Sequence, residues 1–256
     1  MIKKEVCCEL FAMLRSKTKP FGVKFYEDTD ERPQGTMRPQ RPMNTCQITA
    51  FVRYYGRSMY FTAEDMACVV GGVTLGLIEE PESMKNGTIA KMLHADLKSA
   101  KEFTTKVSKI PYGRFKAVAV APMAKLTFEP DLVVMYGNTA QVMRVVQGYL
   151  YKKGGRMNFS TGGEWSLCAD VIAQAYISQD IAVAIPCFGD RKTALAQDDE
   201  LTVAFPYSLY DGILEGMKAT EKVAPYPTPF DIGFPQMPDY TLTPWATKHE
   251  RKRGVK

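Results

Sequence analysis

The chain alternates between short apolar runs of strand length and longer amphipathic stretches of helical length. Apolar runs lie at 21–26, 117–122, 132–136, 181–186 and 201–205, and helical patterns begin near residues 44, 138 and 210. Apolar runs of four to eight residues bounded by turn residues are typical of buried strands, whereas apolar positions three and four apart are typical of helices. Strands that alternate with helices predict an α/β fold.

Two parts of the chain resemble each other. The sequence Asn-Thr-Cys-Gln at 44–47 returns as Asn-Thr-Ala-Gln at 138–141, and each copy follows a strand-like run. Each is followed by a short extended piece, ending at Phe61 or Phe159, and by a second helical segment with a cysteine. Each unit closes with an alanine-valine run that ends in proline. We therefore expect internally duplicated strand-helix-strand-helix-strand units, about 21–122 and 131–188, that form a mixed sheet core with pseudo-two-fold symmetry.

Three segments fall outside this repeat. A loop at 27–43 holds three prolines and three arginines, a second insertion at 79–114 contains a helical pattern over 88–106, and 225–256 is rich in proline and basic residues. Long irregular loops are uncommon in compact domains unless they bind or cover something. These patterns predict one duplicated α/β domain over 1–224 and a proline-rich, basic tail over 225–256.

Charge and hydropathy exclude several protein classes. The chain has 256 residues and a net charge of +5, but five basic residues and one acidic residue in the last nine leave the rest nearly neutral. A nucleic-acid-binding domain usually carries a basic face, so we expect no nucleic-acid partner. No apolar run approaches 18 residues, and the first residues lack the apolar stretch of a signal peptide, so we expect no membrane span and a cytoplasmic location.

Four cysteines are the main candidates for chemistry. Cys46 lies at a helix start, Cys68 and Cys168 occupy matching second helices, and Cys187 follows the closing strand of the second unit. Four converging thiolates suit an iron-sulfur cluster or a tetrahedral zinc ion. Their separations, however, include no local C-x-x-C pair, and free cysteines are often buried as small hydrophobic groups, so both interpretations remain open.

A second group of residues has the chemistry of anion binding. It consists of two helix starts and two arginines, because free backbone N–H groups and guanidinium groups attract phosphates and carboxylates. These candidates are Asn44, Thr45, Asn138, Arg144 and Arg191. The alternative is that the Asn and Thr side chains only cap their helices. With two histidines in the chain, His94 and His249, histidine-dependent hydrolytic sites have no support.

Several motifs together resemble a known family. The motifs are Cys46, Cys68-Val-Val-Gly-Gly with Leu75-Gly-Leu, Pro130-Asp-Leu-Val-Val, Gly137-Asn-Thr-Ala-Gln-Val-Met-Arg, Cys168-Ala-Asp and Pro186-Cys-Phe-Gly-Asp-Arg. In order and context they resemble the archaeal and bacterial family known as domain of unknown function 169, over about residues 5–220. The resemblance implies no settled activity. It implies recurrent cysteines, a pattern that fits a cluster better than four accidental core thiols.

The resulting hypothesis is a protein that binds a [4Fe-4S] cluster, with zinc as a lesser possibility, through Cys46, Cys68, Cys168 and Cys187. It assigns an electron-transfer or accessory redox role in an anaerobic type of metabolism, with a redox partner protein. The alternative is a non-redox binding module or small transferase for a small anionic metabolite, with structural buried cysteines. A homo-oligomer is compatible with either hypothesis, and the sequence decides neither substrate nor catalytic residues.

Overall fold

The computed structural model describes residues 6–229. Within them, one compact unit ends at Tyr226. Helices and strands alternate along it, which confirms the expected α/β class. The expected proline-rich tail falls mainly on residues 230–256, outside the described residues.

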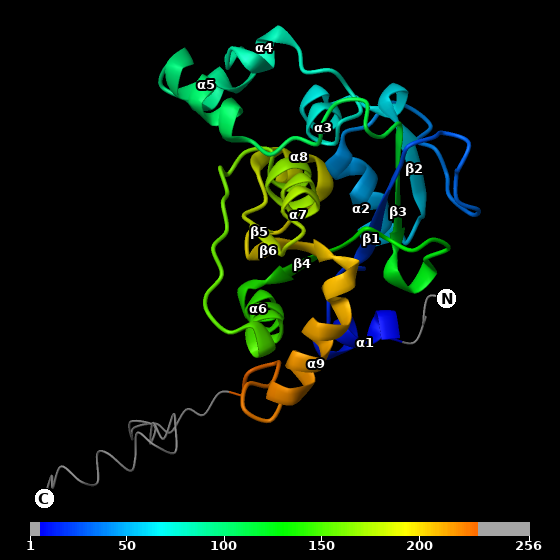
Figure 1. Ribbon diagram of the computed structural model, residues 1–256, viewed down its shortest axis with the longest axis vertical. Coiled ribbons are helices and arrows are strands. Elements are labelled where there is room, and N and C mark those ends of the chain that lie inside the picture. Colours follow the sequence, from blue (N-terminus) through cyan, green and yellow to red (C-terminus); the bar gives the residue numbers. More distant parts are fainter. Residues whose placement is uncertain (1–5, 230–256) are drawn as a thin grey trace, which may run out of the picture. The chain divides into compact units, whose positions relative to one another are not determined.

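A single six-stranded sheet forms the centre of the unit, in the order β2-β3-β1-β4-β6-β5 (Figure 1). Every pair of neighbouring strands is antiparallel, so the expected mixed sheet is wrong. A mixed sheet needs at least one parallel pair, whereas each strand here runs in the opposite direction to its neighbours. The strands are β1 (Phe21–Tyr26), β2 (Met59–Thr62), β3 (Ala117–Pro122), β4 (Leu132–Asn138), β5 (Ala182–Ala184) and β6 (Glu200–Pro206).

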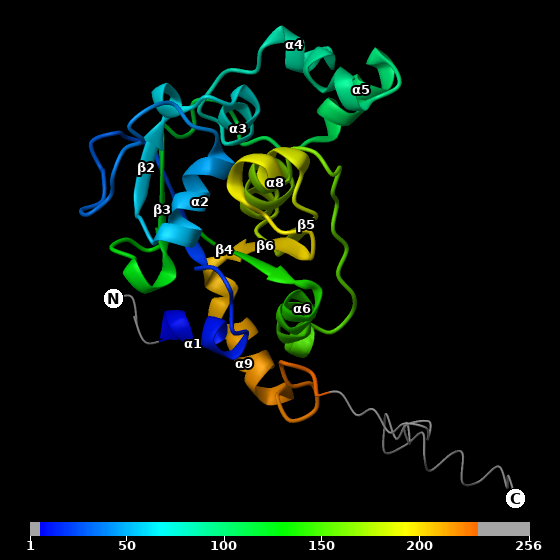
Figure 2. The same ribbon diagram turned by 180° about the vertical axis from the view of Figure 1, so that it is seen from behind.

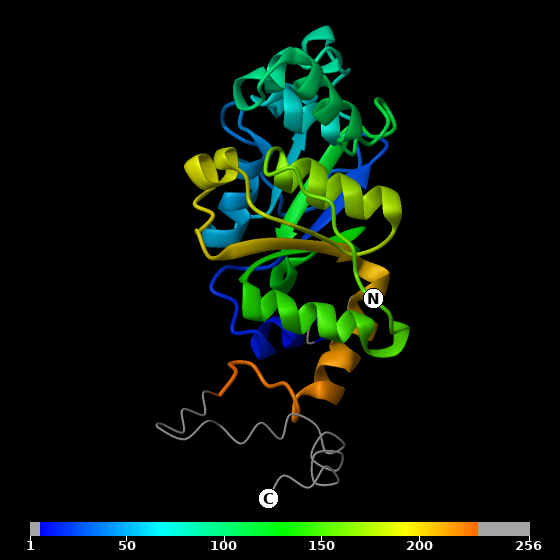
Figure 3. The same ribbon diagram turned by 90° about the vertical axis from the view of Figure 1, so that its left-hand side faces the viewer.

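Helices cover both faces of the sheet, as the views in Figures 1 and 3 agree. Successive side chains of a strand point to opposite faces, so in β4 Leu132 and Val134 join one core and Val133 and Met135 join the other. The first face is covered by α2 (Thr45–Tyr55), α3 (Val69–Thr74), a π-helix (Ser166–Ala173), α7 (Gln174–Ser178) and α8 (Phe188–Ala194). The second face is covered by α1 (Val6–Met13), α6 (Thr139–Lys153) and α9 (Tyr210–Thr220).

The two Asn-Thr motifs begin helices by the same hydrogen bonds. Asn44 accepts the backbone N–H of Gln47 at 2.7 Å, and Asn138 accepts that of Gln141 at 2.9 Å. Each glutamine side chain in turn accepts the backbone N–H of its asparagine. These are complete capping boxes, which satisfy N–H groups that a helix start leaves free.

The insertion after α3 packs mainly on itself and projects from the end of the unit near α3 and α8 (Figure 2). It holds α4 (Glu82–Lys85), a 3-10 helix (Thr88–Leu93) and α5 (Leu97–Lys106). The continuous helix expected over 88–106 is therefore wrong. The chain breaks at Asp96, whose side chain accepts the N–H of Ser99 at 2.7 Å and starts α5 anew.

The remaining short elements are 3-10 helices. They are Ala63–Asp65, Met123–Lys125 and Tyr207–Leu209. The extended piece expected to end at Phe159 forms no strand, because residues 154–165 run as an irregular connection between α6 and the π-helix.

Candidate functional site

The four singled-out cysteines come from four different segments and line one pocket. Cys46 lies in the first turn of α2, Cys68 caps α3, Cys168 lies in the π-helix, and Cys187 precedes α8. The pocket has a volume of about 240 Å³. The structure thus brings together residues up to 141 positions apart in the chain. We call this the thiol pocket.

The rest of the lining is mainly apolar. The pocket is completed by Asn44, Val70, Ile89, Met92, Leu93, Gly163, Glu164, Trp165, Phe188 and Gly189. Ile89, Met92 and Leu93 come from the insertion, so this segment supplies one wall of the pocket. Met92 and Phe188 are strongly exposed, with 87% and 71% of their surface open to solvent, which gives the pocket an apolar rim.

The thiols differ in their surroundings. Burial, followed by the charge of Asp190, raises the pKa of Cys46 well above its usual range. Burial also raises the pKa of Cys168, whose Sγ lies 3.4 Å from the carbonyl oxygen of Trp165. Cys68 is only half-buried, and its sulfur accepts the backbone N–H of Gly71 at 3.5 Å. Raised pKa values keep Cys46 and Cys168 as neutral thiols near pH 7.

In the described residues the thiols are not arranged as a metal site. Within residues 6–229, no group of three or more histidine, cysteine, aspartate or glutamate side chains is arranged to hold a metal ion. This finding contradicts the iron-sulfur, [4Fe-4S] and metal-binding interpretation of Cys46, Cys68, Cys168 and Cys187, and the structure gives no support to the redox role that was inferred from it. The sequence predicted that the four cysteines surround one centre, and they do line one pocket. Side chains can line the same pocket without their sulfur atoms converging on one point.

A buried polar network lies beside the pocket. The hydroxyl of Tyr136 donates to Asp190 at 2.7 Å, and the guanidinium of Arg53 lies 3.3 Å from the centre of the Tyr136 ring. Arg53 also pairs with Glu200 at 3.2 Å. Burial raises the pKa of Asp190, which follows Cys187 by three residues. The network connects α2, α8, β4 and β6 directly behind the thiols.

The two arginines considered for anion binding already have partners within the protein. Buried Arg144 belongs to α6, on the other side of the sheet, and donates to Gln147 of the same helix and to Met217 and Thr220 of α9. Arg191 donates to the carbonyl oxygens of Pro186 and Gln197. An anion at either arginine has to compete with these acceptors.

The asparagines of the two Asn-Thr helix starts are also engaged. Asn44 and Asn138 are occupied as caps, as described above. Thr45 is buried, and its hydroxyl lies under Gly71, where a Cβ atom would approach it to 2.5 Å; among the described residues this hydroxyl has no hydrogen-bond partner. Of the five anion candidates, Asn44 alone lines the thiol pocket.

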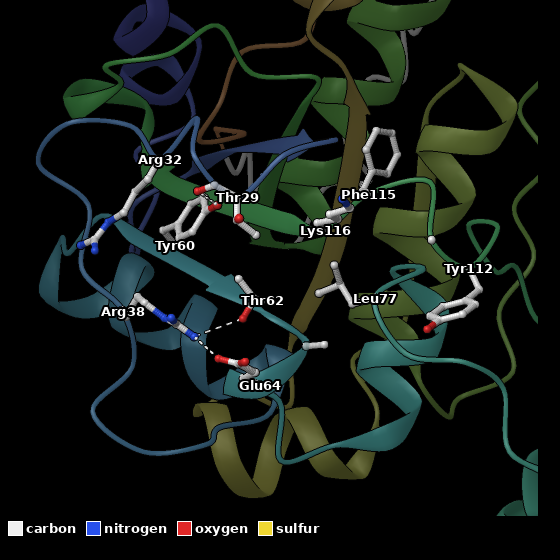
Figure 4. Close-up of a pocket in the computed structure, with 12 residues that line it drawn as sticks. Thr29, Arg32, Arg38, Tyr60, Thr62, Glu64, Leu77, Tyr112, Phe115 and Lys116 are labelled. Carbon is white, nitrogen blue, oxygen red and sulfur yellow. Dashed lines mark hydrogen bonds and ion pairs between the residues drawn. The ribbon is translucent and has the colours of Figure 1, made fainter.

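The arginine-rich loop forms a separate pocket with β2 and the segment before β3 (Figure 4). Arg38 there pairs with Asp65 at 2.8 Å and Glu64 at 3.3 Å, and Arg32 lies over the ring of Tyr60. The positive charge of Arg38 is therefore offset by two carboxylates. No residue of the loop is among the described residues that line the thiol pocket.

Sequence reasoning missed Glu164 and Trp165 as pocket residues. Trp165 adopts a left-handed backbone conformation, with φ of 56°, which is unusual for a residue with a side chain. The π-helix that follows is a rare element, frequent at functional sites. The Gly162-Gly163 pair before Glu164 was the available signal, but it matches no ligand-binding motif.

Comparisons with known proteins agree with the resemblance seen in the sequence. The family model of domain of unknown function 169, described as uncharacterised ArCR, matches residues 9–216. An uncharacterized protein of Methanocaldococcus jannaschii, MJ0308, is 29% identical over 209 residues, which cover 80% of this chain and 89% of that protein. No solved structure matches. In residues 6–229, no helix is long and apolar enough to cross a membrane. The family model covers most of the chain, and the protein therefore belongs to the domain of unknown function 169 family.

Proposed function

We propose that this protein is a binding module that takes a small organic molecule with an apolar body into the thiol pocket. The observation that carries the proposal is the convergence of four thiols and six apolar side chains from separate segments on one open pocket. Ligand pockets are typically concave and mainly apolar, with few polar groups. Neutral thiols behave as small, polarizable apolar groups, so they suit such a ligand.

Local strain supports the same site. A left-handed Trp165 and the adjoining π-helix are costly conformations, and such features persist where surrounding contacts hold them in place, often at ligand sites. The alternative of an anionic metabolite has less support at this pocket, because neither lysine nor arginine is among the described residues that line it. A redox partner and a homo-oligomer remain predictions of the sequence alone.

The test uses the fluorescence of Trp165 as the reporter. The chain has two tryptophans, so Trp245→Phe leaves Trp165 as the single emitter. We expect a saturable change in its emission on titration with 1-hexanol or toluene. Cys68→Phe, which adds volume inside the pocket, should weaken binding by at least about tenfold, equivalent to roughly 1.4 kcal/mol.

A matched control is Val223→Phe, which adds the same aromatic ring at a position 88% exposed and outside the pocket. It should leave the titration unchanged. The absence of saturable binding in the parent protein would refute the proposal, as would equal affinities for Cys68→Phe and Val223→Phe.

We also propose that the chain arose by internal duplication. The support is the strand order, in which β1, β3 and β2 on one side of the sheet occupy the same successive places as β4, β6 and β5 on the other. The capping boxes of α2 and α6 follow the equivalent strands β1 and β4 in the chain, although the two helices cover opposite faces of the sheet. In it, β6 rather than the 181–186 segment is the counterpart of β3.

A further inference from the structure

The thiol pocket has one acidic side chain in its wall, Glu164. Among its described lining residues, no other carries a carboxylate, and none is lysine or arginine. The Glu164 side chain is only 12% exposed, so it has lost most of its contact with water. A carboxylate in such a place is costly unless it is paired or hydrogen-bonded. The position of this carboxylate therefore indicates that a ligand in the pocket carries a group that can pair with it.

The backbone holds Glu164 between two left-handed residues. Gly163 has φ of 70° and Trp165 has φ of 56°. Behind them, the hydroxyl of Ser166 donates to the carbonyl oxygen of Ile185 at 2.6 Å, which ties the start of the π-helix to the end of β5. The ring of Trp165 packs edge-on against Phe103 of the insertion, with centroids 5.0 Å apart. Glu164 and Trp165 are thus presented to the pocket together.

The side chain that pairs with Glu164 in the structure is that of His94. His94 Nε2 lies 3.1 Å from Glu164 Oε1, but without the geometry of a hydrogen bond. The imidazole also packs on Phe103, at 5.1 Å between ring centroids. The contact is an ion pair only while the imidazole is protonated. Burial also raises the pKa of Glu164, because the carboxylate is poorly solvated.

We propose that the ligand of the thiol pocket carries a positively charged amino group, which pairs with Glu164 beside the indole of Trp165. This inference rests on the proposed function and adds the chemical class of the ligand. An ammonium group forms a charge-assisted hydrogen bond to a carboxylate and is attracted to the face of an aromatic ring. The apolar body of the ligand lies against the thiols, Val70 and the side chains of the insertion.

The test compares three probes of equal length that differ at one end: hexylamine, 1-hexanol and hexanoate. Each is titrated at pH 8 into the full chain and into Glu164→Gln by calorimetry. We expect hexylamine to bind about tenfold more tightly than 1-hexanol, and hexanoate to bind most weakly, because it places a second carboxylate beside Glu164. In Glu164→Gln the amine should lose its advantage, while 1-hexanol keeps its affinity.

The control is Glu102→Gln, which removes an exposed carboxylate of α5 outside the pocket. It should preserve the ranking of the three probes. Equal binding of hexylamine and 1-hexanol to the parent chain would overturn the amine proposal and leave the pocket function standing. Binding of none of the three would refute both. The ranking in the parent chain decides the matter even if Glu164→Gln fails to fold.

Discussion

The thiols of the pocket share a site but not a chemical environment. Cys168 is almost fully buried, while Cys68 is half-buried at the start of α3. Thiolates, rather than thiols, react with alkylating agents, so a raised pKa and burial both slow the reaction. The backbone N–H of Gly71 points at the sulfur of Cys68, at 3.5 Å. Reactivity at this site should therefore depend on position within the pocket.

We predict that iodoacetamide at pH 8 labels Cys68 before Cys46 and Cys168. The pKa values of Cys46 and Cys168 are raised by burial, so both remain protonated at a pH where an ordinary thiol is partly ionised. Peptide mass spectrometry over a time course measures each rate in the folded protein. Labelling in denaturant serves as the control, because all cysteines should then react alike. Similar rates for Cys68 and Cys168 in the folded protein would contradict the environments described here.

At the scale of elements, α6 and α9 cross at two glycines. A Cβ atom on Gly216 would lie 2.2 Å from the carbonyl oxygen of Gly148, and one on Gly148 would lie 2.6 Å from that of Ile213. The two helices therefore approach so closely that backbone contacts backbone. Arg144 adds hydrogen bonds across the same interface, to Met217 and Thr220. These glycines are required by packing rather than by turn geometry.

Gly216→Ala should therefore destabilise the protein by about 1–3 kcal/mol, the usual cost of overpacking. Gly212→Ala is the matched control on the same helix, because nothing lies within 4 Å of its added methyl group. This control should stabilise the protein by up to about 1 kcal/mol, because alanine favours helices over glycine. Urea unfolding measures both. A Gly216→Ala variant as stable as Gly212→Ala would show that the helices can separate at little cost.

Local sequence signals predicted most elements but not their arrangement. Capping residues and periodicity were sufficient for α2, α6 and α9, since these depend on neighbours in the chain. The antiparallel order of the strands depends on long-range pairing, such as Val23 with Val120, that no local pattern encodes. The four cysteines were predicted to converge and do line one pocket, whereas the positions of their sulfur atoms depend on side-chain packing. The Gly162-Gly163 pair before Glu164 matches no ligand-binding motif, so neither Glu164 nor the π-helix was predicted.

At the scale of the whole molecule, one buried ion pair joins the two halves of the sheet. Arg53 lies on α2, which follows β1, and Glu200 begins β6 next to β4. Both side chains are almost completely buried, at 0% and 5% exposure, and Arg53 also lies on the ring of Tyr136. Because the pair connects segments 147 residues apart, its loss weakens contacts between the halves rather than within one element.

We predict that Glu200→Ala costs about 3–5 kcal/mol of unfolding free energy, because it leaves the charge of Arg53 buried without its ionic partner. The double variant Arg53→Met, Glu200→Leu should recover much of that loss, since it removes both charges. Glu215→Ala is the control. It breaks the exposed Lys152–Glu215 pair, with side chains 67% and 55% exposed, and should cost less than about 1 kcal/mol. Urea unfolding of the three variants compares these values directly. If Glu200→Ala costs no more than Glu215→Ala, Arg53 does not depend on Glu200, and the two halves are held together by other contacts, such as the apolar core and the pairing of β1 with β4.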